Sequence, residues 1–351
     1  MTLTVVSVAY PFAPVGPDAV GGAEQVLSTL DHALTAAGHR SLVVACEGSS
    51  VAGTLLPVPV APGPIGPAAR AAAHAAVRRR IAEALARHPV DLVHLHGVDA
   101  ADCLPPPGVP ALVTLHLPPH WYPPGLFATG RPDTHLVCVS AAQHRACPPG
   151  ARLLPPIANG VALERFAARL TKRRFALALS RICPEKGIHL ALDAARRAGL
   201  PLLVGGRTFP YEAHERYFAE EIRPRLGGGS RFLGPLAGGR KRRLLAAARC
   251  LLLPSLAPET SSLAAMEALA SGTPVVAFPS GALPGIVEPG VTGFLVSDVA
   301  GMAAAIAQAG RLDPDACRAA AGARFAAGRM AARYLALYSR LAARPLRAGV
   351  A

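Results

Sequence analysis

The sequence predicts an α/β protein built from two doubly wound domains, in which helices cover both faces of each parallel sheet. Short apolar runs recur along the chain, and helix-forming stretches stand between them. This alternation is typical of buried parallel sheets. The 351 residues suffice for two domains with a sizeable core each. Gly and Pro are scattered between the apolar runs, which indicates many strand–loop–helix junctions.

The first half of the chain opens with a predicted strand at residues 5–10, then a Gly/Pro loop and a helix at 23–37. A Pro-rich connection is expected at 57–67, and an amphipathic basic helix at 74–88. The further strands predicted in this half are residues 41–46, 92–96, 112–116 and 135–139.

The second half repeats the alternation after a boundary region at residues 151–172, where Asn159-Gly160 makes a turn. Two such domains in tandem are expected to leave a ligand-binding cleft at the carboxyl ends of both sheets. A last helical stretch is expected at 323–341. The strands predicted in this half are residues 175–179, 200–204, 231–233, 250–253, 275–278 and 294–296.

The net charge of +14 is compatible with three partners: nucleic acid, an anionic membrane surface or a phosphorylated substrate. A bland alternative is a set of solvated basic faces in an Arg- and Ala-rich chain. Aromatic residues make up only 5% of the sequence and do not interleave with the basic ones, which argues against nucleic acid. The low charged fraction of 17% argues against general disorder.

The seven cysteines are dispersed and form no Cys-x-x-Cys pair, so their spacing predicts neither a disulfide framework nor a zinc site. They are expected to be reduced core residues of a cytoplasmic protein. The first residues have no basic region or cleavage signal of an export sequence. No apolar run reaches the ~18 residues needed to span a bilayer. Any membrane contact would therefore be peripheral.

Residues 258–277 combine two carboxylates with a predicted helix. Glu259 precedes the helix in a loop, Ser261 and Ser262 open it, and Glu267 lies on it about two turns further along. Free backbone N–H groups and the positive end of the helix dipole lie between the carboxylates, an arrangement that suits a phosphate group.

Two further stretches carry candidate anion-binding groups. Arg181 and Lys186 follow a strand and precede a helix, so the two cations can converge on a diphosphate. An ordinary basic loop is the alternative. Gly21 and Gly22 lie between the first strand and the first helix, where backbone can approach an anion closely. A plain turn explains that pair equally.

His116 ends a predicted strand, at the position where a polar side chain points into the expected cleft. A hydrogen-bonded structural histidine is the alternative. His94 and His96 share a strand face, but no third ligand stands near in sequence, so a metal is not expected there. The basic cluster at 238–243 is predicted to be a solvated helix face, because such dense like charges repel when buried.

Taken together, these residues resemble the group 1 (family 4) retaining glycosyltransferases, which have the GT-B fold. The resemblance runs from Val5 to about Leu341. It rests on an ordered series of motifs: GGAE, DLVHLHG, TLH, CVSAAQ, NGVALERF, SRICPEKG, the Glu-x7-Glu stretch, GTPVVA, Gly281 and VTGFLV. It implies an N-terminal acceptor-side domain at 1–168, a nucleotide-sugar-binding domain at 169–325, and a C-terminal helix with a tail at 326–351 that crosses back to the first domain.

The resemblance implies a UDP- or GDP-sugar as the donor, held by the second domain. Arg181 and Lys186 would bind the diphosphate and offset charge on the leaving group. Glu267 would accept hydrogen bonds from the ribose hydroxyls, and Glu259 would face the donor sugar. Backbone at Ser262 and Leu263 would contact phosphate or sugar.

The first domain would complete the site with His116, Gly21 and Gly22, which makes His116, Arg181, Lys186 and Glu259 the catalytic candidates. Relatives keep the anomeric configuration. They need no metal or other cofactor, because fixed cations and the helix end replace Mg²⁺. The sequence departs from the family pattern at Ser261-Ser262, at Gly285 and in its short first-domain loops, which affects the donor-sugar and acceptor contacts.

The alternatives are a GT-B relative such as a sugar-nucleotide epimerase, and a non-catalytic sugar-nucleotide-binding protein. The acceptor is either lipid-linked or soluble, such as a small molecule or a saccharide. Arg78 to Arg80 on a basic amphipathic helix slightly favour a lipid-linked or membrane-surface acceptor, with the protein at the inner face of the membrane. The lack of a Trp/Phe-rich apolar face on that helix weakens this preference.

Overall fold

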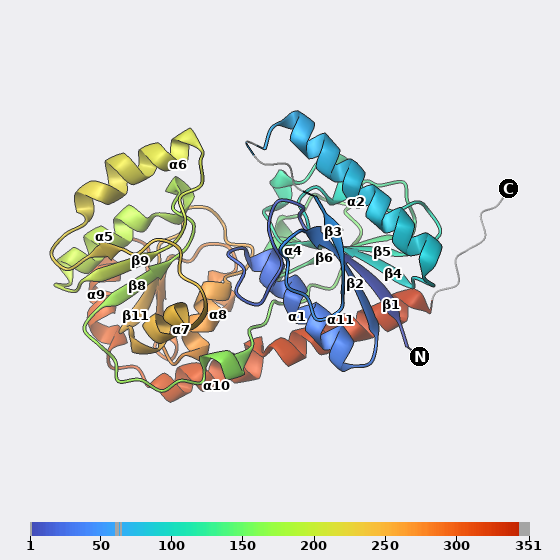
Figure 1. The fold of residues 1–351 in the computed structure, drawn as a ribbon. Coiled ribbons are helices and arrows are strands. Elements are labelled where there is room, and N and C mark those ends of the chain that lie inside the picture. The colour runs from blue at the N-terminus through green and yellow to red at the C-terminus, as the bar shows by residue number, and fades with distance from the viewer. Residues whose placement is uncertain (1, 60–62, 64, 344–351) are drawn as a thin grey trace. The chain divides into compact units, whose positions relative to one another are not determined.

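The computed structural model describes residues 2–59, 63 and 65–343. The chain forms two compact units (Figure 1). The first comprises the residues up to Asn159 together with those from Gly328 onward, and the second runs from Gly160 to Ala327. The sequence had suggested divisions after residues 168 and 325.

The first unit is built on a parallel sheet with the strand order β3-β2-β1-β4-β5-β6-β7. Its interior strands are almost wholly buried, as expected for apolar runs covered on both faces. Its strands are β1 (Thr4–Val8), β2 (Arg40–Cys46), β3 (Thr54–Val58), β4 (Leu92–Leu95), β5 (Ala111–Leu115), β6 (Thr134–Cys138) and β7 (Leu153–Leu154).

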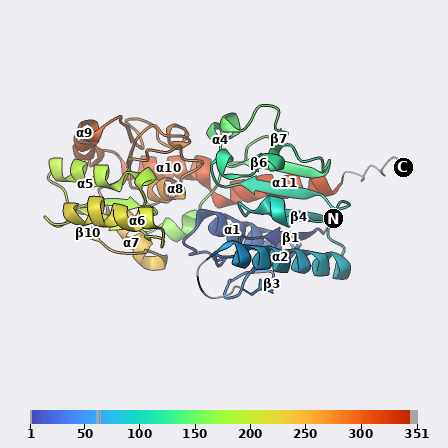
Figure 2. The same ribbon diagram turned by 90° about the horizontal axis from the view of Figure 1, so that it is seen from above.

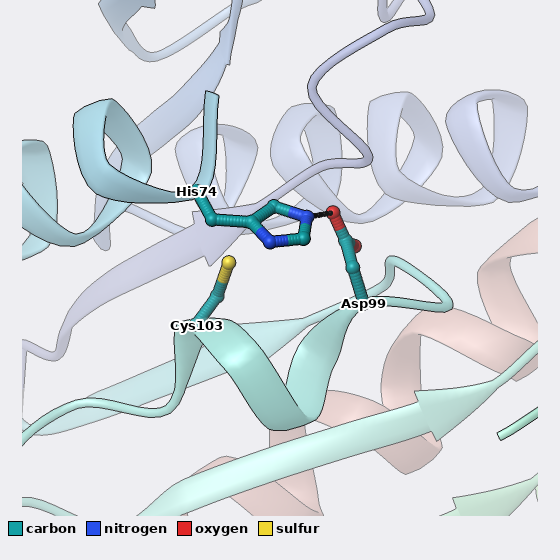
Figure 3. Close-up of side chains that lie close together, drawn as sticks. All are labelled: His74, Asp99 and Cys103. Atoms are coloured by element: carbon teal, nitrogen blue, oxygen red, sulfur yellow. Dashed lines mark ion pairs between the residues drawn. The ribbon is translucent and has the colours of Figure 1, made fainter. Parts of the chain in front are cut away.

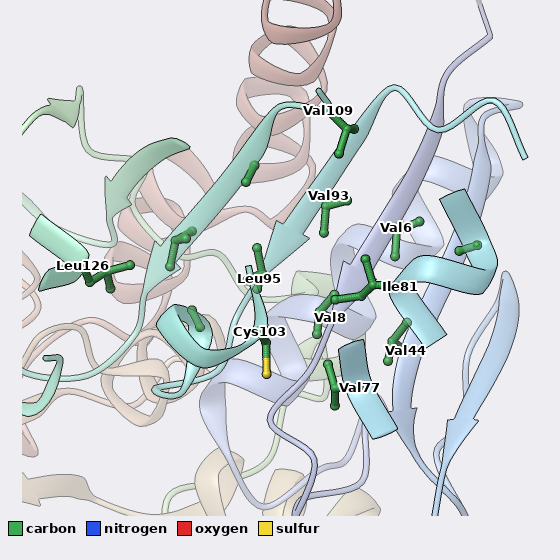
Figure 4. Close-up of a cluster of buried hydrophobic side chains, with 14 of the residues drawn as sticks. Val6, Val8, Val44, Val77, Ile81, Val93, Leu95, Cys103, Val109 and Leu126 are labelled. Atoms are coloured by element: carbon green, nitrogen blue, oxygen red, sulfur yellow. The ribbon is translucent and has the colours of Figure 1, made fainter. Parts of the chain in front are cut away.

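Helix α2 packs on one face of this sheet. Val77 and Ile81 on the helix lie against Val8 and Val44 on the strands (Figure 4). The helices and short helical turns of the unit are α1 (Gly22–Ala36), α2 (Pro67–Arg87), η1 (Ala100–Cys103), η2 (Pro119–Trp121), α3 (Pro124–Phe127), α4 (Ala141–Ala146) and α11 (Ala327–Ala342).

The sequence analysis missed β3, because it assigned Pro57 to a Pro-rich connection. Pro57 lies within β3, which is the edge strand of the sheet. A proline removes one backbone donor, and an edge strand tolerates this because one of its sides is unpaired.

The C-terminal helix α11 belongs to the first unit, as the resemblance implied, and Figure 2 shows it beside β4 and β6. Two buried tyrosines attach it. The Tyr338 hydroxyl is 2.8 Å from Nδ1 of His94, and the Tyr334 hydroxyl is 3.1 Å from Oγ1 of Thr114. The single helix expected at 323–341 is wrong, because Ala326 is extended and separates α10 (Pro314–Phe325) from α11.

The second unit contains a parallel sheet with the strand order β10-β9-β8-β11-β12-β13. The order reverses between β8 and β11, and in such sheets ligands bind next to that point, beyond the carboxyl ends of the strands. The strands are β8 (Ala176–Leu179), β9 (Leu202–Gly205), β10 (Arg231–Phe232), β11 (Cys250–Leu253), β12 (Val275–Ala277) and β13 (Gly293–Leu295).

Two apolar clusters cover the faces of this sheet, one with α8 and α10 and one with α5 and α9. The helical elements of the unit are η3 (Leu163–Phe166), η4 (Pro184–Lys186), α5 (Ile188–Arg197), α6 (Glu212–Tyr217), η5 (Phe218–Ile222), η6 (Arg223–Arg225), α7 (Gly238–Ala247), α8 (Leu263–Ala270), η7 (Leu283–Gly285), α9 (Val299–Ala309) and α10.

Among the described residues, the structure contains no helix with the length and apolar character to cross a bilayer.

Candidate functional site

The loops that follow β8 and β11 are joined at the point where the strand order of the second unit reverses. The backbone N–H of Leu256 donates to the Glu185 carbonyl at 2.9 Å. Gly187 has φ +60°, and a Cβ there would lie 2.2 Å from the Pro254 carbonyl oxygen. Only glycine allows this approach without strain, so the SRICPEKG and Glu-x7-Glu motifs are held together by their backbones.

Lys186 and Glu259 form an ion pair across these loops. Lys186 Nζ is 2.6 Å from Glu259 Oε1, with 21% and 12% of the two side chains exposed. The Ser255 hydroxyl donates to the same Oε1. The pair places a cation and a carboxylate at a partly open edge of the sheet. An anionic ligand group that reached this edge could replace Glu259 as the partner of Lys186.

The backbone of Glu259 is fixed from a third loop, the one after β12. The Ala282 N–H donates to the Glu259 carbonyl at 2.8 Å. Gly281 has φ +58°, and a Cβ there would lie 2.2 Å from that carbonyl oxygen. Gly281 therefore lets the loop close directly onto Glu259.

Helix α8 begins where the sequence predicts. Ser262 is its N-cap, and its Oγ accepts a hydrogen bond from the Ala265 N–H at 3.3 Å. Leu263 is the first helical residue, and its side chain is partly buried. The Oγ of Ser261 is buried and has no hydrogen-bond partner among the described residues. A helix start with one polar group still to satisfy suits a hydrogen-bonding ligand.

Glu267 lies on α8 and is 4% exposed. Its Oε1 is 2.6 Å from Nζ of Lys241, which lies on α7. Lys241 also lies over the Phe166 ring, 6.0 Å from its centre. The prediction that residues 238–243 form only a solvated face is therefore wrong at Lys241, whose side chain is 13% exposed and paired.

Lys241 is the residue that the sequence analysis missed. The chain has three lysines (Lys172, Lys186 and Lys241) against its many arginines, and two of them pair with the two carboxylates of the Glu-x7-Glu stretch. The sequence marks Lys241 only as a lysine inside a run of arginines. Its pairing with Glu267 depends on the packing of α7 on α8, which the sequence pattern does not show.

Arg181 stands two residues after β8 and is partly buried. Hydrogen bonds on both sides fix its backbone: its carbonyl accepts from the Ser180 hydroxyl at 2.8 Å, and the next N–H, of Ile182, donates to the Arg207 carbonyl at 3.0 Å. Arg181 and Lys186 both lie in the connection between β8 and α5.

In the first unit, His116 follows β5 and belongs to a buried group of histidines. Its Nε2 is 3.0 Å from Nδ1 of His96, and the two rings are stacked. Its backbone N–H donates to the Tyr122 hydroxyl at 2.9 Å. Burial lowers the pKa of His116 to about 3, and burial also holds the pKa of His96 well below its usual range. Both rings are therefore neutral at pH 7.

His94 is the structural histidine of the group. Its Nδ1 is 2.8 Å from the Tyr338 hydroxyl and its Nε2 is 2.7 Å from Oγ1 of Thr114. Both ring nitrogens of His94 are thus occupied by protein groups, and the absence of a metal at His94 and His96 stays a prediction.

Gly21 is the N-cap of α1, and Gly22 is its first residue. The side chain of Glu24 folds back over Gly21, so that a Cβ there would lie 1.8 Å from Oε2 of Glu24. Burial raises the pKa of Glu24, which is 7% exposed. The carboxyl group of Glu24 thus lies at the start of α1, where the sequence analysis placed a ligand anion.

The structure brings Lys186 and Glu259 into contact and places Arg181 in the same loop. Ser262, Leu263 and Glu267 lie on the adjoining helix α8. His116, Gly21 and Gly22 belong to the other unit.

Two family models together match most of the chain. "Glycosyl transferases group 1" matches residues 173–310, and "Glycosyltransferase Family 4" matches residues 20–165. The chain belongs to the group 1 (family 4) glycosyltransferases.

Its relatives support the same family. Glycogen synthase of Mycobacterium tuberculosis is 34% identical over 170 residues, which is 45% of this chain and 40% of that protein. The chain spans less than half of the length of the curated relatives that it matches.

Several solved structures resemble nearly the whole chain. The glycosyltransferase AviGT4, involved in avilamycin A biosynthesis, has a TM-score of 0.72 at 23% identity, covering 97% of this chain and 99% of that one. Alr3699/HepE of Anabaena, in complex with UDP-glucose, has a TM-score of 0.72 at 19% identity, covering 96% and 99%. With its two parallel-sheet units, this family member has the GT-B fold.

Proposed function

We propose that this protein is a retaining glycosyltransferase, which moves a sugar from a UDP- or GDP-linked donor to a hydroxyl acceptor without a metal ion. The observation that carries the proposal is the Lys186–Glu259 pair at the reversal point of the second sheet. A relative of the same fold was solved with UDP-glucose, which supports a nucleotide sugar as the donor.

The donor diphosphate would replace Glu259 as the partner of Lys186. Glu259 would then be available to accept hydrogen bonds from hydroxyls of the donor sugar. Arg181, in the same loop, would bind the second phosphate. Two fixed cations stabilise the negative charge that develops on the leaving nucleotide, and they need little reorganisation because their loops are held by backbone contacts.

The start of α8 would add neutral donors. The backbone around Ser262 and Leu263 supplies N–H groups at the positive end of the helix dipole, and the unsatisfied Ser261 hydroxyl lies next to them. Glu267 would accept from the ribose hydroxyls, with Lys241 holding its carboxylate in place. These groups would take over the role of Mg²⁺ in metal-dependent transferases.

His116 and the Gly21-Gly22 loop would serve the acceptor side from the first unit. Because His116 is neutral, it can accept or donate a hydrogen bond to a sugar hydroxyl without adding charge. The acceptor would be a soluble small molecule or saccharide, or a lipid-linked sugar reached by peripheral contact with a membrane from the cytoplasm.

The test offers the purified chain a panel of UDP-, GDP- and ADP-sugars and follows release of free nucleotide, with and without candidate acceptors. Transfer from a UDP- or GDP-sugar, with the anomeric configuration of the product determined by NMR and activity retained in EDTA, is the expected result.

Each other outcome identifies an alternative. Conversion of the donor sugar without transfer would identify an epimerase. Heat stabilisation by a nucleotide with no turnover would identify a binding protein. If no nucleotide sugar is turned over or raises the melting temperature, the proposal is wrong.

A further inference from the structure

A group of metal-ligand side chains lies in the first unit, apart from the residues of the proposed reaction. His74 on α2, Asp99 after β4 and Cys103 at the end of η1 each offer one ligand atom, and these atoms all lie within 4.8 Å of one another. Figure 3 shows the imidazole of His74 between the Asp99 carboxylate and the Cys103 thiol. An imidazole, a carboxylate and a thiol are the three ligand types that zinc takes in proteins.

The contact between His74 and Asp99 is short and almost wholly buried. Nε2 of His74 is 2.9 Å from Oδ2 of Asp99, and 13% and 8% of the two side chains are exposed. Both atoms are buried, yet neither has a hydrogen-bond partner with good alignment among the described residues. A cation bound beside the two atoms would satisfy both of them.

Cys103 completes the group from the end of η1. It is 2% exposed and packs at the border of the apolar core beside Val77 (Figure 4). When a divalent cation binds, the coordinating thiol loses its proton to solvent as the metal–sulfur bond forms.

We propose that His74, Asp99 and Cys103 form a zinc site that joins helix α2 to η1. A tetrahedral ion needs a fourth ligand, and solvent takes that position. Asp102 orients the imidazole from its other ring nitrogen, because its Oδ2 is 3.6 Å from Nδ1 of His74 whereas Asp99 faces Nε2. The ion offsets the charge of the buried carboxylate and fixes α2 against the loop that follows β4.

The experiment uses the full-length chain, stripped with a chelator and then titrated with Co²⁺ and with Zn²⁺. Bound Co²⁺ absorbs through its thiolate ligand, so the optical titration reports a Cys ligand directly. We expect one equivalent of Co²⁺ with a thiolate charge-transfer band, displaced by Zn²⁺, and a melting temperature that rises with added Zn²⁺.

Variants locate the site. Cys103→Ala removes the band, and Asp99→Asn weakens Zn²⁺ binding by at least about 10–100-fold. Cys46→Ser is the matched control, because Cys46 is a buried thiol of the same unit, and it leaves both unchanged. If Cys103→Ala does not fold, His74→Gln, on a helix, decides by the same readout.

Two results overturn the proposal. One is a wild-type chain that binds no Co²⁺ with a thiolate band. The other is a band that persists in Cys103→Ala or His74→Gln. Such a band would arise from the group of Cys183, Glu185 and His214 in the second unit, or from the neighbouring thiols of Cys138 and Cys147. Because no sugar is involved, the result stands independently of the transferase assay.

Discussion

The carboxyl ends of the two sheets carry opposite kinds of chemistry. In the second unit the loops and helix there hold two lysine–glutamate pairs, Lys186–Glu259 and Lys241–Glu267. In the first unit the corresponding positions hold neutral histidines, His96 and His116, buried and bonded to each other. The fold is repeated, but the charge is not. The second unit therefore presents charged pairs at this edge of its sheet, and the first presents neutral rings.

The two ion pairs also differ from each other. Lys186 and Glu259 lie in loops and keep some exposure, whereas Lys241 and Glu267 lie on two packed helices and are more deeply buried. A buried pair that loses one member leaves an uncompensated charge, which is more costly than losing an exposed pair. The first pair is thus suited to exchanging partners, and the second to holding a fixed position.

Glu267→Gln has the largest expected effect, on stability. It leaves the Lys241 ammonium without its carboxylate, which lowers the free energy of unfolding by roughly 3–5 kcal/mol. Urea unfolding followed by circular dichroism measures it. The double variant Glu267→Gln/Lys241→Met recovers part of the loss, because both charges are gone. Equal stability of wild type and Glu267→Gln would show that the pair holds nothing in place.

Lys186→Ala has the next largest effect, on turnover. Loss of a cation that stabilises the leaving diphosphate costs about 2–4 kcal/mol of transition-state stabilisation. The kcat of nucleotide release measures it. Arg197→Ala, an exposed cation on α5, is the control and keeps full activity. Unchanged turnover in Lys186→Ala would place the diphosphate elsewhere.

Gly281→Ala separates close packing from backbone strain. A Cβ at Gly281 meets the Glu259 backbone, whereas Gly290 has a similar positive φ and open space around it. Strain alone costs roughly 1–3 kcal/mol, so both variants lose stability. Only Gly281→Ala also displaces Glu259 and raises the KM for the donor. An equal KM in the two variants would show that the Gly281 contact is irrelevant to the donor.

Acid is expected to lower the stability of the first unit, because its buried histidines are neutral in the folded chain. The pKa of His116 is about 3 in the folded chain against roughly 6.5 unfolded, so below pH 6.5 the unfolded state binds a proton that the folded state does not. Stability is fully present above pH 6.5 and is lost as the pH falls toward 3, by at most about 1.4 kcal/mol per pH unit for this group. The pKa values of His94 and His96 are depressed by burial in the same direction.

Thermal unfolding between pH 7.5 and 5.5 measures this dependence. His116→Gln flattens the profile, while His120→Gln, at an exposed position, leaves it as it was. A profile that is equally steep in His116→Gln would assign the acid response to other groups.

The sequence by itself determined the repeated strand–helix order, the family and the loops that meet at the reversal point of the second sheet. Apolar runs and glycines are local signals, and their consequences are local as well. Only the tertiary structure decided that Lys241 pairs with Glu267, that His94 serves α11, and that His74 lies beside Asp99 and Cys103. Each of these contacts joins residues from different elements, and no local pattern encodes which helix faces pack together. The break at Ala326 and the edge strand around Pro57 have the same origin, because packing against a neighbour outweighed local propensity.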